Sequence, residues 1–165
     1  MLRHDDGRFI TNMKKYLNIA FVYAIAAMVG GVFYREFTKW QGFDGVTALG
    51  KVHTHLFLLG MMMFLVVALF SMHYDLESRR TFRLILWVYN IGTPLTTVML
   101  AVRGIVQVLG LSEGLSAGAN ASISGIAGIG HILTGLGIIL LLVSLKKAAT
   151  VATAAKATEA TKATR

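Results

Sequence analysis

The sequence predicts an all-α fold, a bundle of four transmembrane helices with both termini in the cytoplasm, and three observations support this prediction. Hydrophobic residues make up 55% of the 165 residues and charged residues only 15%, which is unusual for a soluble domain of this size. The hydrophobic residues gather in four long segments. The basic residues lie between these segments and at the ends of the chain.

Each apolar segment is long enough to cross a bilayer. The four segments extend over about residues 16–34, 53–74, 84–102 and 123–145. Each is roughly 19–23 residues long, and a helix that rises about 1.5 Å per residue needs about 20 residues to cross the hydrocarbon. The first segment is too long for a signal peptide and lacks a small-residue cleavage motif, so we expect it to be a span.

The parts of the chain outside the spans are short and mostly polar. We expect a polar tail over residues 1–12, a four-helix transmembrane domain over residues 13–147 and a low-complexity tail rich in Lys, Ala and Thr over residues 148–165. Residues 75–83 are a short loop, which makes the second and third helices antiparallel neighbours.

The distribution of basic residues predicts the orientation. If both termini lie on one side, all but four of the 16 Lys and Arg residues lie on that side, and the four are Arg35, Lys39, Lys51 and Arg103. An excess of Lys and Arg marks the cytoplasmic side, so we expect a multi-pass protein of the bacterial inner membrane with both termini inside. The net charge of +8 has no accompanying basic face with aromatic residues, so the expected partner is the lipid bilayer and not nucleic acid.

Two histidines are expected to meet in the outer half of the bundle. In this orientation the second and fourth helices both enter from outside, which places His55 about 6 Å and His131 about 13 Å below the outer edge. A histidine inside the membrane needs a partner, and two at similar depth can ligate one metal ion or haem iron. Ser124, Gly128 and Gly135 share the helical face of His131, and such small residues leave space either for a flat macrocycle or for another helix. The sequence therefore predicts a haem b held by His55 and His131, for electron transfer or for haem sensing or handling.

A haem also needs cations for its propionates. Arg103 and Arg35 end their apolar segments on the outer side, where the propionates of such a haem would emerge, and Arg suits planar pairing with carboxylates. The same two residues could equally extend to the membrane surface without binding anything.

The remaining sulfur and imidazole groups offer an alternative metal site. His53 is two residues from His55 and therefore about 200° around the helix, so we do not expect the two to share one site. Met62 is seven residues after His55 on the same helical face, and His53 with Met62 is the alternative ligand set, for copper. Methionines in such runs also serve as adaptable packing. The chain has no cysteine, which excludes thiolate metal sites.

Two resemblances add to these expectations. The segment His53-Thr-His55-Leu-Phe-Leu-Leu-Gly60 resembles the histidine-bearing second helix of haem–copper oxidase subunit one relatives. That resemblance implies His55 as a ligand of a low-spin haem. It implies no oxygen reduction, because the chain lacks the many helices and the multi-histidine copper centre of that family. The whole chain resembles a family of small four-helix bacterial membrane proteins known as a domain of unknown function, which implies a topology and no activity.

Two other functions stay open at this point. One is transport or handling of copper or a small solute; four helices are few for this unless subunits associate, and the Gly-rich fourth helix allows a homo-oligomer. The other is a structural membrane protein without a cofactor.

A redox partner or a quinone is expected only with the haem function. No span contains a carboxylate pair or a Ser/His/Asp set, so hydrolysis is not expected, and the sequence does not decide whether the protein is an enzyme.

Overall fold

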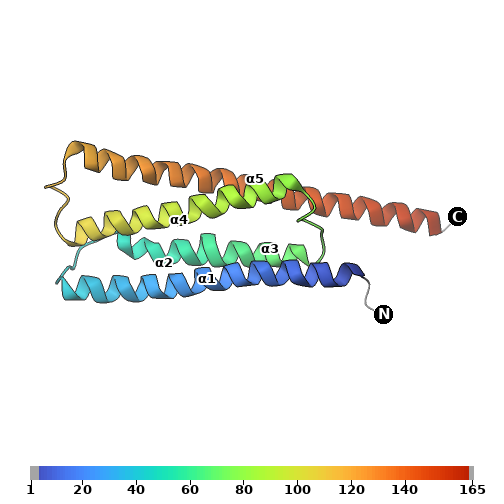
Figure 1. Ribbon diagram of the computed structural model, residues 1–165, viewed down its shortest axis with the longest axis horizontal. Coiled ribbons are helices and arrows are strands. Elements are labelled where there is room, and N and C mark those ends of the chain that lie inside the picture. The colour runs from blue at the N-terminus through green and yellow to red at the C-terminus, as the bar shows by residue number, and fades with distance from the viewer. Residues whose placement is uncertain (1–3, 164–165) are drawn as a thin grey trace.

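The computed structural model describes residues 4–163, which form an all-helical bundle (Figure 1). The segments in chain order are α1 (His4–Trp40), the 3-10 helix η1 (Ala48–Lys51), α2 (Val52–His55), the π-helix η2 (Leu56–Met62), α3 (Met63–Ser71), α4 (Arg80–Val108) and α5 (Ala117–Ala163). The four segments from Ala48 to Ser71 follow one another without a break and are called the second helix below. The predicted all-α class is confirmed.

Four helices in the described part of the chain are long and apolar enough to cross a membrane. They cover Ile10–Trp40, Ala48–Ser71, Arg80–Val108 and Ala117–Ala154, in agreement with the four predicted spans. Because the helices are antiparallel, both described ends of the chain lie at the same end of the bundle (Figure 1). The cytoplasmic placement of that end stays a prediction from the charge distribution.

The outer helices are longer than the predicted spans. α1 begins at His4, within the polar tail expected over residues 1–12, and α5 continues to Ala163 through most of the tail expected over residues 148–165. Ala is the strongest helix former and recurs throughout this C-terminal segment, so the helix continues after hydrophobicity ends. Residues 1–3 and 164–165 of the two expected tails lie outside the described residues.

The helices pack in chain order. The second helix packs on α1 and α4, and α5 packs on α4, so α1 and α5 lie at opposite edges of the bundle (Figure 1). Because α5 is held mainly by α4, one side of α5 has no helix packed against it. This arrangement decides where the histidines are exposed.

Small residues bring α4 and α5 into direct backbone contact. A Cβ atom added to Gly92 of α4 would lie 2.6 Å from the backbone nitrogen of Thr134, and one added to Gly130 of α5 would lie 2.8 Å from the backbone nitrogen of Thr96. The hydroxyls of Thr96 and Thr134 lie 3.4 Å apart in the same contact. Small residues allow this close approach between membrane helices, where van der Waals packing is a main driving force for association.

Aromatic side chains join α1, the second helix and α4. Tyr23 of α1 stacks on Phe64 with ring centroids 5.7 Å apart, and its hydroxyl donates to Oδ1 of Asn90 on α4 at 2.6 Å. The Tyr89 hydroxyl donates to the backbone carbonyl of Leu59, which lies in the π-helical segment. These contacts satisfy polar groups where no water is available to do so.

The close approach of α4 and α5 predicts that Gly130→Ala destabilises the protein. The added methyl group has no room against Thr96, and overpacking of this kind costs about 1–3 kcal/mol. Thermal unfolding in detergent measures the effect. Gly125→Ala is the matched control, since a Cβ atom there meets nothing within 4 Å, and it should leave the melting temperature unchanged or slightly higher. Equal melting temperatures for the two variants would contradict the packing described here.

Candidate functional site

The start of the second helix is fixed against α4, and this sets the position of His55. The hydroxyl of Thr47 accepts a hydrogen bond from the backbone nitrogen of Leu49 at 3.2 Å and donates to the carbonyl of Gly104 at 3.1 Å. The backbone of Leu49 lies so close to Gly104 that a Cβ atom there would overlap with it. His55 is the last residue of α2 before the π-helix begins. Segments of π-helix are rare and occur frequently at functional sites.

The rings of His55 and His131 lie next to each other. Their centroids are 6.4 Å apart and their planes make an angle of 83°. His55 belongs to the second helix and His131 to α5, two helices that otherwise pack on α4 and not on each other. The prediction that the two imidazoles meet is therefore confirmed, while ligation of an iron stays a prediction.

Both rings are held in the same way by their own helices. Nδ1 of His55 lies 2.9 Å from the carbonyl oxygen of Lys51, and Nδ1 of His131 lies 2.8 Å from the carbonyl oxygen of Ala127. A carbonyl oxygen can only accept, so Nδ1 carries the proton in each ring, and Nε2 of the neutral ring keeps its lone pair. Metal-ligating histidines are usually held by such a bond from the other ring nitrogen. Among residues 4–163, neither Nε2 has a hydrogen bond.

The separation of the rings is short enough for one metal centre to reach both. A bond from a metal to an imidazole nitrogen is about 2.0 Å long, and the two ring centroids lie 6.4 Å apart. His55 and His131 are therefore the residues that would hold such a group, each through Nε2.

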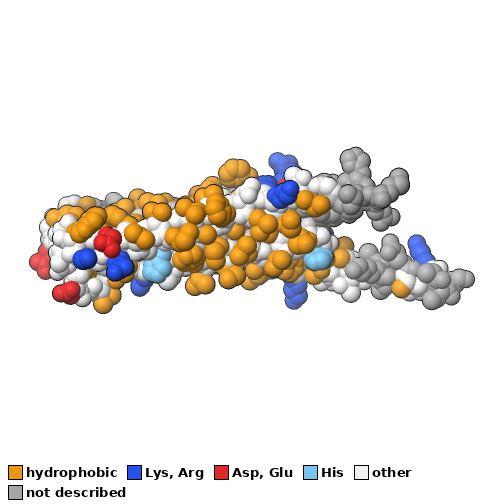
Figure 2. Space-filling view, turned by 90° about the horizontal axis from the view of Figure 1, so that it is seen from below, with side chains coloured by type: hydrophobic (Ala, Val, Ile, Leu, Met, Phe, Trp, Pro, Cys, Tyr) orange, Lys and Arg blue, Asp and Glu red, His pale blue; other side chains and the backbone are white. Residues whose placement is uncertain are grey.

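The pair lies at the surface of the bundle, beside open space on α5. His131 is exposed and His55 is half-buried. A Cβ atom added to Gly128 or Gly135, which flank His131, would meet nothing within 4 Å. Figure 2 shows histidine side chains at the two ends of a broad hydrophobic face. The two Nε2 atoms are therefore accessible to a group from outside the chain.

Of the two predicted propionate partners, the structure brings Arg103 to α5. Its Nη1 donates to Oδ1 of Asn120 at 2.6 Å and its Nη2 to the hydroxyl of Ser124 at 2.7 Å. Ser124 is seven residues before His131, about 10 Å along α5 toward the loop that joins α4 and α5. Arg35 lies on α1 with its side chain 83% exposed, 3.8 Å from Glu36, and the structure does not bring it to the histidine pair.

The alternative ligands His53 and Met62 lie in different local surroundings. His53 packs against Gly31 of α1, and its Nδ1 is buried with no hydrogen-bond partner in the described part of the chain. The expectation that Met62 shares the face of His55 assumed α-helical turns. Residues Leu56–Met62 are π-helical, so that assumption does not hold over this stretch, and a ligand role of Met62 stays a prediction. Among the described residues, no group of three or more His, Cys, Asp or Glu side chains is arranged to hold a metal ion.

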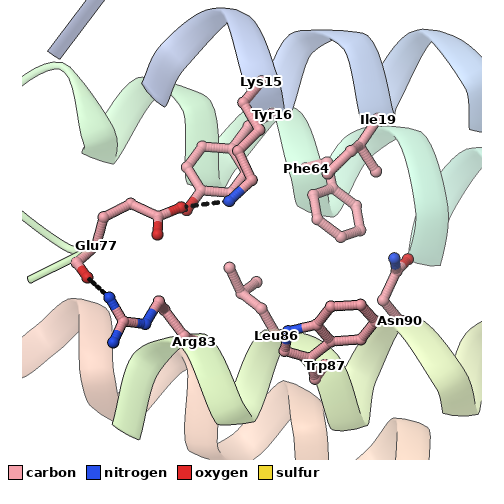
Figure 3. A pocket seen from close by; sticks show the side chains of 9 residues that line it. All are labelled: Lys15, Tyr16, Ile19, Phe64, Glu77, Arg83, Leu86, Trp87 and Asn90. Carbon is pink, nitrogen blue, oxygen red and sulfur yellow. Dashed lines mark hydrogen bonds and ion pairs between the residues drawn. The ribbon is translucent and has the colours of Figure 1, made fainter. Parts of the chain in front are cut away.

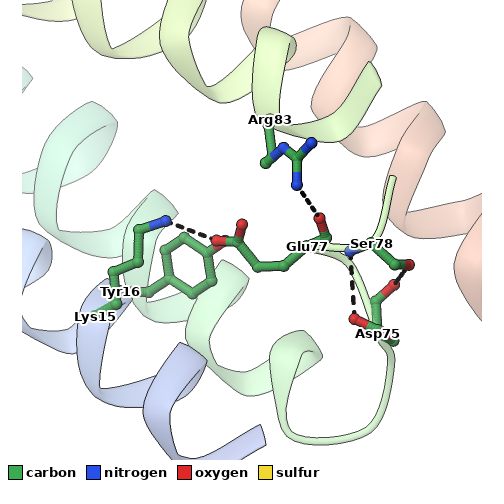
Figure 4. A network of polar contacts seen from close by, with 6 residues as sticks. All are labelled: Lys15, Tyr16, Asp75, Glu77, Ser78 and Arg83. Atoms are coloured by element: carbon green, nitrogen blue, oxygen red, sulfur yellow. Dashed lines mark hydrogen bonds and ion pairs between the residues drawn. The ribbon is translucent and has the colours of Figure 1, made fainter. Parts of the chain in front are cut away.

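A cluster of charges that the sequence analysis missed lies at the opposite end of the bundle (Figure 4). The carboxylate of Glu77, in the loop before α4, accepts hydrogen bonds from Nζ of Lys15 at 2.7 Å and from the hydroxyl of Tyr16. Nη1 of Arg83 donates to the backbone carbonyl of Glu77 at 3.0 Å. Burial raises the pKa of Glu77, but the hydrogen bonds from Lys15 and Tyr16 and the charges of Lys15 and Arg83 outweigh it, so the pKa lies below its ordinary value.

Comparison with known proteins gives one match. A family model described as a protein of unknown function (DUF2871) matches residues 13–148, a range one residue longer than the transmembrane domain expected over residues 13–147. Neither the curated proteins nor the solved structures gave a match. The histidine pair must therefore be interpreted from its own chemistry.

The contacts of Glu77 predict a pH-dependent contribution to stability. Because its pKa is lowered on folding, the stabilisation is complete above the ordinary Glu pKa of about 4.3 and is lost as the pH falls through the pKa of the folded state. Glu77→Gln should therefore lower the melting temperature by a few degrees at neutral pH, and this difference should shrink on acidification. Glu36→Gln is the control and should change little. A difference that grows as the pH falls would contradict the role given to Glu77.

Proposed function

Since the chain belongs to the DUF2871 family of proteins of unknown function, we propose its function from its own residues: it is an integral membrane protein that binds haem b through His55 and His131. We place it in the bacterial inner membrane, where it takes part in electron transfer or in haem sensing or handling. The observation that carries the proposal is the pair of rings 6.4 Å apart, each with Nδ1 bonded to a carbonyl of its own helix.

The ligand set favours haem over a bare metal ion. A porphyrin supplies four nitrogen ligands to its iron, so two imidazoles from the protein complete the coordination. Copper or zinc without a macrocycle needs more protein ligands, and the described residues provide no group of three His, Cys, Asp or Glu side chains.

The surroundings of the pair suit a flat hydrophobic group. The open positions Gly128 and Gly135 leave one side of α5 uncovered, and the carbonyls of Lys51 and Ala127 fix the tautomer and orientation of both rings. Arg103 is the cation on the outer side of the pair and is held by Asn120 and Ser124. A haem with two imidazole ligands supplies a one-electron carrier without an open coordination position, which suits electron transfer. The protein would bind the haem, orient it and exclude water from it.

The proposal predicts a haem absorption spectrum for the purified protein. Protein expressed with sufficient haem and purified in detergent should show a Soret band that shifts on reduction with dithionite. His55→Ala and His131→Ala should each lower the haem bound per protein by at least about tenfold or change the spectrum, because each removes one ligand. His73→Ala, two residues after the second helix ends, is the matched control and should retain the band.

Three outcomes would overturn this proposal. The first is colourless wild-type protein after expression with sufficient haem. The second is an unchanged Soret band in both His55→Ala and His131→Ala. The third is stoichiometric copper, found by elemental analysis, without a Soret band, which would support the copper alternative.

Arg103 gives a second test of the same site. A charge-assisted hydrogen bond to a propionate contributes about 1.5–3 kcal/mol, so Arg103→Gln should weaken haem binding about tenfold or more without changing the position of the Soret band. Titration of the haem-free protein with haem measures the affinity. Arg35→Gln is the matched control on the same side of the membrane. Equal affinities for the two variants would remove Arg103 from the site.

A further inference from the structure

A second site lies far from the histidine pair, at the end of the bundle that holds both described chain ends. A cavity of about 240 Å³ lies there between α1, α3 and α4 (Figure 3). Its middle is apolar and is lined by Ile19, Phe64, Leu86 and Trp87. The polar residues that also line it are Lys15, Tyr16, Glu77, Arg83 and Asn90. Phe64 is fully buried, whereas Trp87 is 69% exposed, so the cavity is open to the surrounding lipid past Trp87.

Hydrogen-bond donors lie at both ends of this apolar cavity (Figure 3). At the deep end is Asn90, whose Oδ1 is occupied by the Tyr23 hydroxyl. Its Nδ2 group has no hydrogen bond among residues 4–163, and Asn90 lines the cavity. At the other end is Lys15, which has three donor hydrogens and uses one for the carboxylate of Glu77. The cavity therefore suits a flat, apolar ligand with an acceptor at each end.

The two donors lie at different levels along the bundle, which narrows the ligand further. Tyr16, beside Lys15, and Tyr23, whose hydroxyl bonds to Asn90, are two turns apart on α1, a rise of about 10.5 Å between their backbone positions. A ligand that bonds to both donors therefore needs acceptors at opposite ends, as the two carbonyl oxygens of a para-quinone are.

We propose that this cavity binds the headgroup of a membrane quinone, with one carbonyl at Nδ2 of Asn90 and the other at Nζ of Lys15. The volume suits a ring and not a whole ligand, so the isoprenoid tail leaves past Trp87 into the bilayer. A phospholipid fits less well: its phosphate would meet the carboxylate of Glu77 beside Lys15, and its acyl chains carry no acceptor for Asn90. The site is separate from the histidines, and its occupancy does not require haem.

Trp87 provides a reporter for this site. The chain has two Trp residues, so Trp40→Phe leaves Trp87 as the single fluorophore. Quinones quench tryptophan fluorescence on contact. Titration of the detergent-purified Trp40→Phe protein with a short-chain ubiquinone, and separately with a short-chain menaquinone, should give saturable quenching with at least one of the two. The Trp87→Phe protein, which retains Trp40, should show only the linear quenching that comes from quinone dissolved in the micelle.

Variants at the two ends of the cavity test the assigned contacts. In the Trp40→Phe background, Asn90→Leu and Lys15→Met should each raise the half-saturation concentration about three- to tenfold, as expected for the loss of one hydrogen bond. Lys15 is at the surface, so its variant is informative even if Asn90→Leu, which also removes the acceptor of Tyr23, fails to fold. His55→Ala should leave the titration unchanged, which separates this result from the result for the haem site.

Linear quenching of Trp87 by both quinones would overturn the proposal. Saturable quenching that is the same in Lys15→Met and in every folded Asn90 variant would also overturn it. A saturable fluorescence change with a short-chain phosphatidylglycerol and not with a quinone would show that the occupant is a phospholipid.

Discussion

Polar groups inside a bilayer have no water to bond with, and this constraint explains where most polar side chains of the bundle lie. The hydroxyl of Tyr23 bonds to Asn90, and that of Tyr89 bonds to the carbonyl of Leu59. Each of these bonds also joins two helices, so polar satisfaction and helix packing are achieved by the same contacts. The Nε2 atoms of His55 and His131 depart from this pattern, because the described residues satisfy Nδ1 of each ring and leave Nε2 unpaired.

The packing of α5 explains why the unpaired Nε2 atoms lie at this position. Glycines on one side of α5 give backbone contact with α4, while Gly128 and Gly135 on the other side face open space. The histidines lie where this open side approaches the second helix. The packing is also incomplete at the cavity between α1, α3 and α4. The unpaired donors of Asn90 lie at this cavity. The two proposed sites thus lie toward opposite ends of the bundle.

Much of the fold, and the histidine pair, could be predicted from the sequence because depth in a membrane helix increases linearly with residue number. Counting from the outer edge was enough to bring His55 and His131 together. The π-helix from Leu56 to Met62 could not be predicted from the sequence, because no residue pattern in this apolar run distinguishes it from an α-helix. Glu77 and its partners on α1 are more than sixty residues apart in sequence, and their contact depends on packing that no periodicity reports.

The central claim, two imidazoles on one iron, is tested most directly by the electron paramagnetic resonance spectrum of the purified ferric protein. Two imidazole ligands make ferric iron low-spin, and ring planes near perpendicular, as the 83° angle indicates, make the signal highly anisotropic. The account predicts such a low-spin signal for the wild type and its loss in His131→Ala. A high-spin signal in the wild type, or a low-spin signal that is unchanged in His131→Ala, would contradict it.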